Sequence, residues 1–193
     1  MASQAREIIL GKISKSLKEH SVEMPFPEAE KMNTFFAKED LTAEEKFAKE
    51  FAALGGKFVY CADEHELMDQ LQALADTMKW QNIQCKDSFL LHLFEEKNIA
   101  LVQAANDMHD IEIGLSLCEC LVARTGSVIM SSAQESGRSL PVYSPIHIAI
   151  AFSNQVVWDI SDSIKLMQEK YHGQLPSMMS LTTGPSRTAD IEK

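Results

Sequence analysis

The stretch TAEEKFAKEFAALGGKFVYCADEHELMDQLQALADTM, residues 42–78, decides the fold class. Thr42 and Glu45 match a capping box, in which a Thr hydroxyl and a Glu carboxylate satisfy the first free amides of a helix. The Gly-Gly pair that follows ends this helix, the β-prone run 57–61 predicts a short strand, and Asp63 is the expected cap of a second helix. The order helix, strand, helix is typical of an α/β domain.

The same alternation continues toward the middle of the chain. The second helix is expected to carry its apolar face at Leu67, Leu71, Leu74 and Met78. A further helix is predicted around 89–95 and a strand at 99–102, before a polar turn at Asn106-Asp107. Because strands joined through helices pair in parallel, we expect an α/β fold with a mostly parallel sheet flanked by helices.

From Gly114 onward the sequence changes to short β-prone pieces separated by turns. These pieces are residues 121–122, 127–130, 147–152 and 156–158. The later ones are close enough in sequence to pair as hairpins. Ser161 is the expected cap of one more helix with Ile164 and Met167 on its inner face, and 178–181 is the expected last strand.

The N-terminal part predicts a separate helical appendage. Ile9, Ile13 and Leu17 form one narrow apolar stripe, and the run Met24-Pro25-Phe26-Pro27 breaks the helix that carries it. Such a helix is marginal alone, so it is expected to pack on another surface. The expected domains are an N-terminal helix with a proline-containing arm at 1–40 and an α/β domain at 41–193.

The charge balance excludes some classes of partner. The 193 residues include 18 basic and 28 acidic ones, a net charge of −10, and the isoelectric point is near 5.0. Nucleic acid and anionic membrane both reward a basic surface, so neither is expected as a partner. No stretch approaches the roughly 20 consecutive apolar residues of a membrane helix, and the start of the chain is polar. A cytoplasmic location is expected.

The acidic charge is concentrated in the first part of the chain. Residues 1–113 contain 12 basic and 21 acidic side chains, whereas residues 114–193 contain 6 and 7. Three of the four arginines, Arg124, Arg138 and Arg187, fall in the second part beside Gly, Ser and Thr. An anion site, if the chain has one, is therefore expected there.

Metal and redox motifs are weak. Cys61, Cys85, Cys118 and Cys120 follow neither a disulfide framework nor Cys-x-x-Cys spacing, so free thiols are expected, with no zinc or iron-sulfur site. A cluster of Asp107, His109, Asp110 and Glu112 has the side chains of a metal site. A solvated turn is favoured there because no partner ligands are identifiable elsewhere. His147, inside a predicted strand, is expected to be a hydrogen-bonded residue at the edge of the core rather than a catalytic base.

Three loops carry the residues of an anion site. The run 183–190 combines Gly184, hydroxyl side chains and Arg187 directly after a predicted strand. The alternative is a turn in which Ser186 or Thr188 caps a helix and Arg187 pairs with Asp190. Loops 123–127 and 135–141 have a similar composition, with a hairpin turn and a flexible loop as their alternatives. The three arginines would converge if the loops meet at the edge of the sheet.

The candidate anion- or ligand-binding residues are Thr125, Gly126, Ser127, Arg138, Gly184, Pro185, Ser186, Arg187, Thr188 and Asp190. No residue is assigned a catalytic role, and no metal ligand is assigned. The sequence has no Gly-x-Ser-x-Gly elbow, His-Glu-x-x-His, phosphate-binding Gly-x-x-x-x-Gly-Lys or Gly-x-Gly-x-x-Gly. The common hydrolase, zinc-protease and nucleotide-binding classes therefore lose support.

The stretch Thr183-Gly184-Pro185-Ser186-Arg187-Thr188-Ala189-Asp190-Ile191-Glu192 resembles the lactate-utilisation protein C family, also called the LUD domain family. The late motif of that family reads Ser/Thr-Gly-Pro-Ser-Lys/Arg-Thr-Ala-Asp-Ile-Glu. Residues 123–130 resemble a family segment with Glu-Thr-Gly-Thr/Ser before a β-run, and Leu140-Pro141 with 145–150 resembles a third pattern. The resemblance covers residues 42–193.

This resemblance implies a fold and a role. The fold would be related to ribose-5-phosphate isomerase, glucosamine-phosphate deaminase and the CoA-transferases. The role would be oxidation of L-lactate to pyruvate, as an accessory subunit of a complex whose iron-sulfur clusters belong to partner proteins. Which member performs the lactate chemistry is not fixed by the resemblance, so enzyme status stays open.

Two departures from the family pattern stand out. Arg124 occupies the place where the family commonly has Glu, which removes an acid and adds a cation. The family motif usually leads into a further strand, so a final strand is expected to be missing after Lys193. Two other hypotheses remain open: a stand-alone enzyme acting on a sugar phosphate or CoA thioester, and a regulatory scaffold whose acidic N-terminal helices bind a protein.

Overall fold

The computed structural model describes residues 2–19, 40–100, 102–104 and 111–184. The chain divides into two compact units, residues 1–40 and 41–193. In the first unit, helix α1 (Ala2–Glu19) confirms the predicted N-terminal helix, and its stripe residues Ile9, Ile13 and Leu17 are at least half exposed. No helix in the described ranges is long and apolar enough to cross a membrane.

Helices α2 (Ala43–Ala53) and α3 (Glu64–Met78) begin where their predicted caps lie. The Thr42 hydroxyl accepts from the Glu45 amide at 3.2 Å, and the Glu45 carboxylate accepts from the Thr42 amide at 2.9 Å. Asp63 accepts from the Glu66 amide at 2.9 Å. The capping signals therefore located both helix starts correctly.

The predicted strand at 57–61 is wrong. The segment lies extended between α2 and α3 but is paired with no strand in the described chain, and Phe58, Val59 and Tyr60 are exposed. The Phe58 ring instead contacts Phe47 of α2 edge-on, with centroids 5.7 Å apart. A β-prone composition forms a strand only where a neighbouring strand is available to pair with it.

The apolar face of α3 is also rotated from the predicted one. Met68, Leu71 and Ala75 are buried, whereas Leu74 and Met78 are 37% and 47% exposed. Both sets have helical spacing, and the small Ala75 was not recognised as a contact residue.

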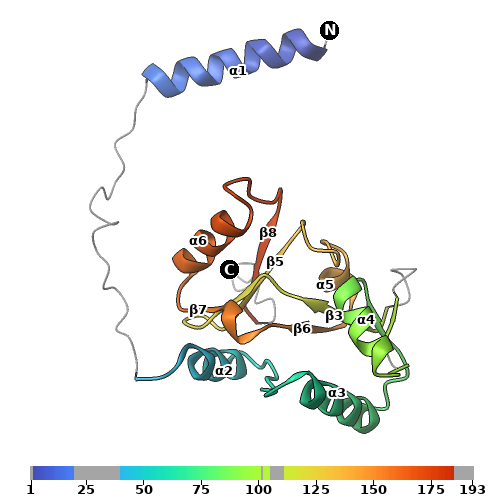
Figure 1. Ribbon diagram of the computed structural model, residues 1–193. Helices are drawn as coiled ribbons and strands as arrows, with labels where there is room; N and C mark the ends of the chain where they lie inside the picture. Colours follow the sequence, from blue (N-terminus) through green and yellow to red (C-terminus); the bar gives the residue numbers. More distant parts are fainter. Residues whose placement is uncertain (1, 20–39, 101, 105–110, 185–193) are drawn as a thin grey trace, which may run out of the picture. The chain divides into compact units, whose positions relative to one another are not determined.

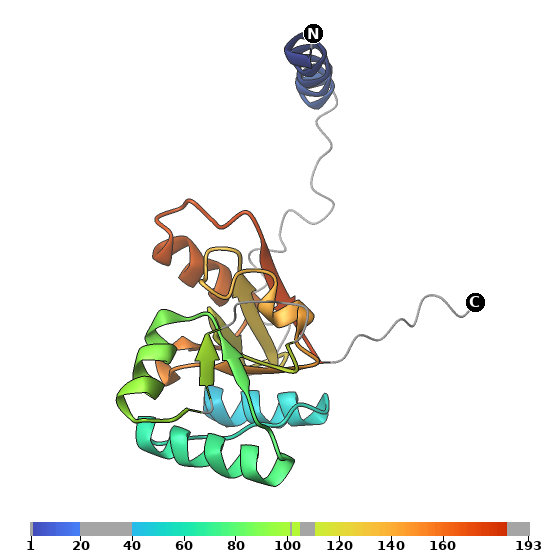
Figure 2. The ribbon, with the colours of Figure 1, turned by 90° about the vertical axis from the view of Figure 1, so that its right-hand side faces the viewer.

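The parallel sheet contains four strands in the order β2-β1-β3-β6 (Figures 1 and 2). They are β1 (Ile83–Cys85), β2 (Val102–Ala104), β3 (Ile113–Leu117) and β6 (Ile146–Ile150). Helix α4 (Ser88–Glu96) joins β1 to β2, and the short α5 (Leu140–Tyr143) precedes β6. One face of this sheet packs Ile83, Ile113 and Leu115 against side chains of α3 and α4 in a hydrophobic core.

The mixed sheet has the order β7-β4-β5-β8. Its strands are β7 (Val156–Val157), β4 (Cys120–Val122), β5 (Ser127–Ser131) and β8 (Met179–Thr182). A short 3-10 turn, Ser153–Gln155, precedes β7. Strands β4 and β5 pair antiparallel, so residues 123–127 form the hairpin turn given as the alternative for that loop. The later pieces do not form a hairpin with each other, because β6 and β7 belong to different sheets. Leu121 and Met130 pack with Phe47 of α2, and Val122 and Ile129 with α6 (Ile160–Lys170), so the two helices cover opposite faces.

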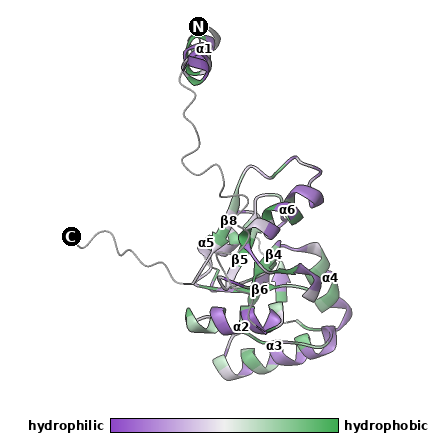
Figure 3. Cartoon of the chain, turned by 90° about the vertical axis from the view of Figure 1, so that its left-hand side faces the viewer, coloured by the Kyte–Doolittle hydropathy of each residue, from purple (hydrophilic) through white to green (hydrophobic). Residues whose placement is uncertain are grey.

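Helix α6 differs in detail from its prediction. Its cap is Asp159, whose carboxylate accepts from the Ile160 amide, rather than Ser161. Met167 is buried as expected, but Ile164 is 42% exposed. The fold class itself is confirmed, because most strand pairs are parallel and helices flank both sheets. Figure 3 shows hydrophobic colour among the strands and mixed colour on α2 and α3.

Candidate functional site

The turn between β4 and β5 positions Thr125, Gly126 and Ser127. Gly126 has a φ of +60°, a conformation that other residues rarely adopt. A Cβ at this position would lie 2.6 Å from the amide nitrogen of Phe51 in α2. Glycine is therefore required both by the conformation of the turn and by its close approach to the α2 backbone.

Strand β8 brings the second predicted loop to the same place. Val128 of β5 is paired with Thr182 of β8, so Thr183 follows beside Ser127 (Figure 1). Ser127 Oγ lies 2.6 Å from Thr183 Oγ1 and Thr125 Oγ1 lies 2.6 Å from Ser127 Oγ. We call these three hydroxyls the hydroxyl chain. Its central member, Ser127, is fully buried, and Thr183 at one end is exposed.

Gly184 closes the described part of this site. Its φ is +67°, and a Cβ there would lie 3.0 Å from Cβ of Leu54, at the C-terminal end of α2. Both glycines of the two loops thus lie against the same helix. The 125–127 turn and the start of the 183–190 run therefore lie side by side and are backed by α2.

Arg124 is directed away from the hydroxyl chain. Its guanidinium donates two hydrogen bonds to the Asp159 carboxylate, at 3.0 and 2.8 Å. The Arg124 hydrogen bonds hold the pKa of Asp159 below its usual value. Arg124 stands where the family commonly has Glu, and its positive charge is paired with the carboxylate that caps α6. It is therefore not an additional positive charge for an anion.

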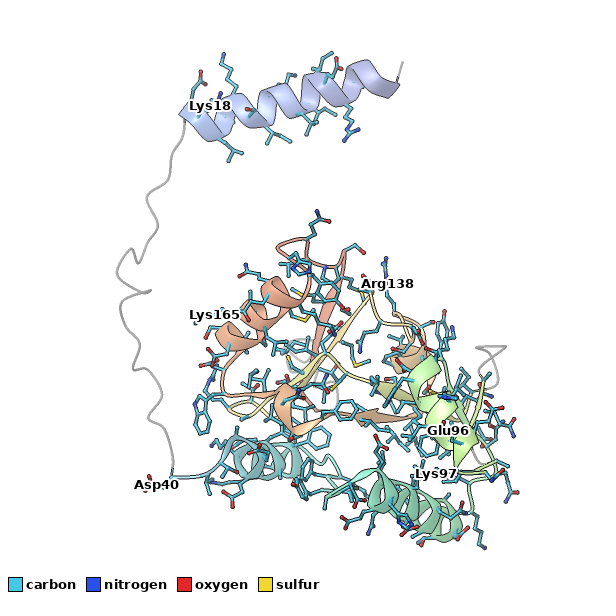
Figure 4. All side chains as sticks on the ribbon, in the orientation of Figure 1. Lys18, Asp40, Glu96, Lys97, Arg138 and Lys165 are labelled. Carbon is cyan, nitrogen blue, oxygen red and sulfur yellow. The ribbon has the colours of Figure 1, made fainter. Side chains whose placement is uncertain are left out.

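Arg138 lies on a different part of the fold. Ser127 begins β5 and Arg138 follows its other end, beyond Ser131, so the length of the strand, about 13 Å, separates the two ends. Figure 4 labels Arg138 at that end of the sheet. The structure does not bring Arg138 to the hydroxyl chain. Pro185, Ser186, Arg187, Thr188 and Asp190 lie outside the described residues.

A buried ionic cluster at the Ser131 end of β5, away from the hydroxyl chain, was not identified from the sequence. Glu119 has a fully buried side chain. Its carboxylate accepts from Lys170 Nζ and Tyr171 Oη at 2.7 Å each, and from Ser131 Oγ at 2.5 Å. The cluster ties α6 to β5 across the mixed sheet. The sequence feature that could have revealed this cluster is the single carboxylate inside the apolar run 115–123. A charge buried in such a run needs partners.

Burial raises the pKa of three cysteine thiols, that of Cys85 and of Cys118 to about 12 and that of Cys120 to about 11. All four cysteines are free in the structure. Asp107, His109 and Asp110 of the proposed acidic turn lie outside the described residues, and the described residues contain no group of three ligand-type side chains able to hold a metal.

His147 is a half-buried residue of β6, as expected from the sequence. Its Nε2 lies 2.9 Å from Ser116 Oγ on the neighbouring strand β3. Burial lowers the pKa of His147 to about 4, so the imidazole is neutral near pH 7. This dyad is on the parallel sheet, away from the hydroxyl chain.

The architecture defines a class of α/β domain in which a parallel and a mixed sheet share one chain. A crystal structure of a DUF162 family protein from Deinococcus radiodurans has this fold, with a TM-score of 0.57 over 75% of this chain and 90% of that one. The two sequences are 15% identical, so the likeness concerns the fold alone.

The family follows from the sequence profile of the LUD domain, which matches residues 81–193, more than half of the chain. The chain belongs to the LUD domain family. Lactate utilization protein C of Bacillus licheniformis is 29% identical over 99 residues, covering 50% of this chain and 39% of that protein. The protein of the same name from Geobacillus kaustophilus is 30% identical over 98 residues, covering 50% and 38%. The matched part spans less than half the length of these relatives.

Proposed function

We propose that this protein takes part in L-lactate utilisation, as a cytoplasmic accessory subunit of a complex that oxidises L-lactate to pyruvate. The membership in the LUD domain family and the names of the relatives support the lactate role. In this proposal the iron-sulfur clusters belong to partner proteins. The spacing of the cysteines and the burial of Cys85, Cys118 and Cys120 support that division, because a cluster needs several convergent thiolates.

The observation that carries the proposed site is the hydroxyl chain. It joins the two segments that resemble family motifs, 123–127 and 183–190, although 56 positions separate Ser127 from Thr183. Hydroxyls and glycines at such a junction are suited to a small anion or to the backbone of a partner. In this proposal Arg187, which lies outside the described residues, would supply the cation of the site.

Two experiments test these statements separately. Deleting the gene in its host is expected to abolish growth on L-lactate, with growth restored by the wild-type gene; unaffected growth would refute the role. For the site, phosphate or L-lactate is expected to raise the melting temperature of the wild-type protein and not of Arg187→Ala. Equal stabilisation of both proteins would refute the anion assignment.

A further inference from the structure

Helix α1 exposes a narrow seam of regularly spaced residues. Leu10, Ile13 and Leu17 are each at least half exposed, and the exposed Arg6 continues their line toward the N-terminus. The steps between these four residues are 4, 3 and 4 positions, the spacing of the a and d positions of a coiled coil. At about 100° per residue, the four lie within an arc of about 60°. We call them the α1 seam.

The lysines of α1 lie away from the seam. Lys12, Lys15 and Lys18 are each displaced from its centre by more than about 100° around the helix. Lys15 lies 3.7 Å from the carboxylate of Glu19 on the same helix. Figure 4 shows side chains on both sides of α1, with Lys18 labelled near its C-terminal end. An exposed apolar seam with charges at the outer positions is what a helix presents to another helix.

The spacing of the seam reads the same in both directions, so the seam matches a reversed copy of itself. In an antiparallel pair of α1 helices, Leu10 of one copy lies opposite Ile13 of the second copy, and Ile13 lies opposite Leu10. Arg6 of each copy then lies opposite Leu17 of the other, at the ends of the pair, where a guanidinium reaches solvent. This reciprocity is what a twofold interface between identical chains requires.

Charge favours the antiparallel direction over the parallel one. The first half of α1 contains Arg6 and Glu7, whereas the second half contains three lysines and Glu19, a net charge of +2. A parallel pair would put the two basic halves together and would bring the two Arg6 side chains to the same point of the seam. An antiparallel pair separates the two Arg6 positions by about 16 Å, the rise of 11 residues, and lays each basic half along a neutral one.

We propose that α1 is a homodimerisation helix, which joins two copies of this chain as an antiparallel pair along the α1 seam. Its 18 residues make a helix about 27 Å long. A single helix of that length covers less than the about 800 Å² per partner of a standard interface, so the pair is weak and reversible. It forms at micromolar concentrations, and it brings two copies of the candidate site into one assembly.

The test is sedimentation equilibrium of the full chain over a series of concentrations. Wild type is expected to reach twice the chain mass of 21.6 kDa at the high end of the series. Ile13→Glu places two charges at the centre of the pair and is expected to raise the dimer Kd about 100-fold or more. Ile8→Glu is the matched control, because Ile8 is more than half exposed but lies on the opposite side of the helix. It should leave the Kd unchanged.

Leu17→Glu tests the direction of the pair. In the antiparallel pair the new carboxylate lies opposite Arg6 of the second copy, and an ion pair at each end replaces the lost apolar contact. The Kd is therefore expected to stay within about threefold of wild type and to become more sensitive to salt. Arg6→Glu combined with Leu17→Glu restores repulsion at both ends and is expected to dissociate the pair.

A wild type that stays at 21.6 kDa at every concentration would overturn the proposal, and so would a dimer that Ile13→Glu leaves intact. Dissociation by Leu17→Glu alone, to the same extent as by Ile13→Glu, would overturn the antiparallel pairing. A monomeric wild type that sediments with vesicles of anionic lipid would overturn it in favour of a membrane surface. None of these outcomes bears on the lactate role, which growth on L-lactate tests.

Discussion

Two features of the structure require a glycine at position 126, and their contributions to stability can be measured separately. Gly126→Ala is expected to lower the free energy of unfolding by about 2–4 kcal/mol, because it combines a left-handed conformation with a Cβ placed against the α2 backbone. Gly173→Ala is the matched control, since Gly173 has a φ of +79° and open space around it. It is expected to lose only about 1 kcal/mol. Equal losses in urea unfolding would show that α2 does not press on the turn.

The half-exposed ammonium of Lys170 forms an ion pair with the buried carboxylate of Glu119. Burial by itself lowers the pKa of Lys170, but the hydrogen bond and charge of Glu119 outweigh it and raise the pKa above 10.5. A raised folded pKa means that the contribution is fully present below pH 10.5 and is lost as the pH rises through the folded value.

Lys170→Met is therefore expected to be less stable than wild type by about 1–2 kcal/mol near neutral pH, a value reduced for solvent screening. The difference should shrink as the pH rises above 10.5. Urea unfolding at a series of pH values measures it. Lys165→Met, on the exposed side of α6, is the control and should change little. A deficit that grows above pH 10.5 would contradict the assigned ion pair.

Individual site residues were predictable to different degrees. Thr125, Ser127 and Gly184 were identified because hydroxyls and glycines in turns are visible in local sequence, and the structure places them together. Arg138 was grouped with them on composition alone, and the opposite end of β5 holds it elsewhere. Glu119 was missed because its partners, Lys170 and Tyr171, follow about fifty positions later.

At the scale of elements, α2 supports the site from behind. Phe47 is 2% exposed and stacks on Phe51 with centroids 5.2 Å apart. Phe47→Ala is expected to cost about 3–5 kcal/mol in urea unfolding, because it opens a cavity between α2 and the mixed sheet. Phe89→Ala is the control, because Phe89 is 48% exposed, and should cost about 1 kcal/mol or less. Similar losses would show that α2 is not anchored through Phe47.

The elements that were predicted well are those with local signals. Thr42 and Asp63 located the starts of α2 and α3, since a cap is decided by side chains within one helical turn. The three-residue strand β1, with Gln84 at its centre, was not predicted, and the β-prone run 57–61 was assigned as a strand without being one. Strand formation depends on distant partners, and a single sequence does not show these.

At the scale of the whole molecule, the acidic charge and the candidate site lie in different parts of the sequence. The net charge of −10 comes mostly from residues before Gly114, whereas the hydroxyl chain lies in the nearly neutral part. An acidic protein can bind an anion when its donors and cations are local. The mostly parallel fold and the family were predictable from motif order and from the 183–190 run, and both are confirmed.

The most direct test of the central claim is a reconstituted assay of lactate-dependent dye reduction. The iron-sulfur partner proteins would be purified and assayed with L-lactate and a redox dye, with and without this chain. We predict that dye reduction falls to background when the chain is omitted and returns when the wild-type protein is added. Dye reduction at an undiminished rate without the chain would contradict its role as a subunit in lactate oxidation.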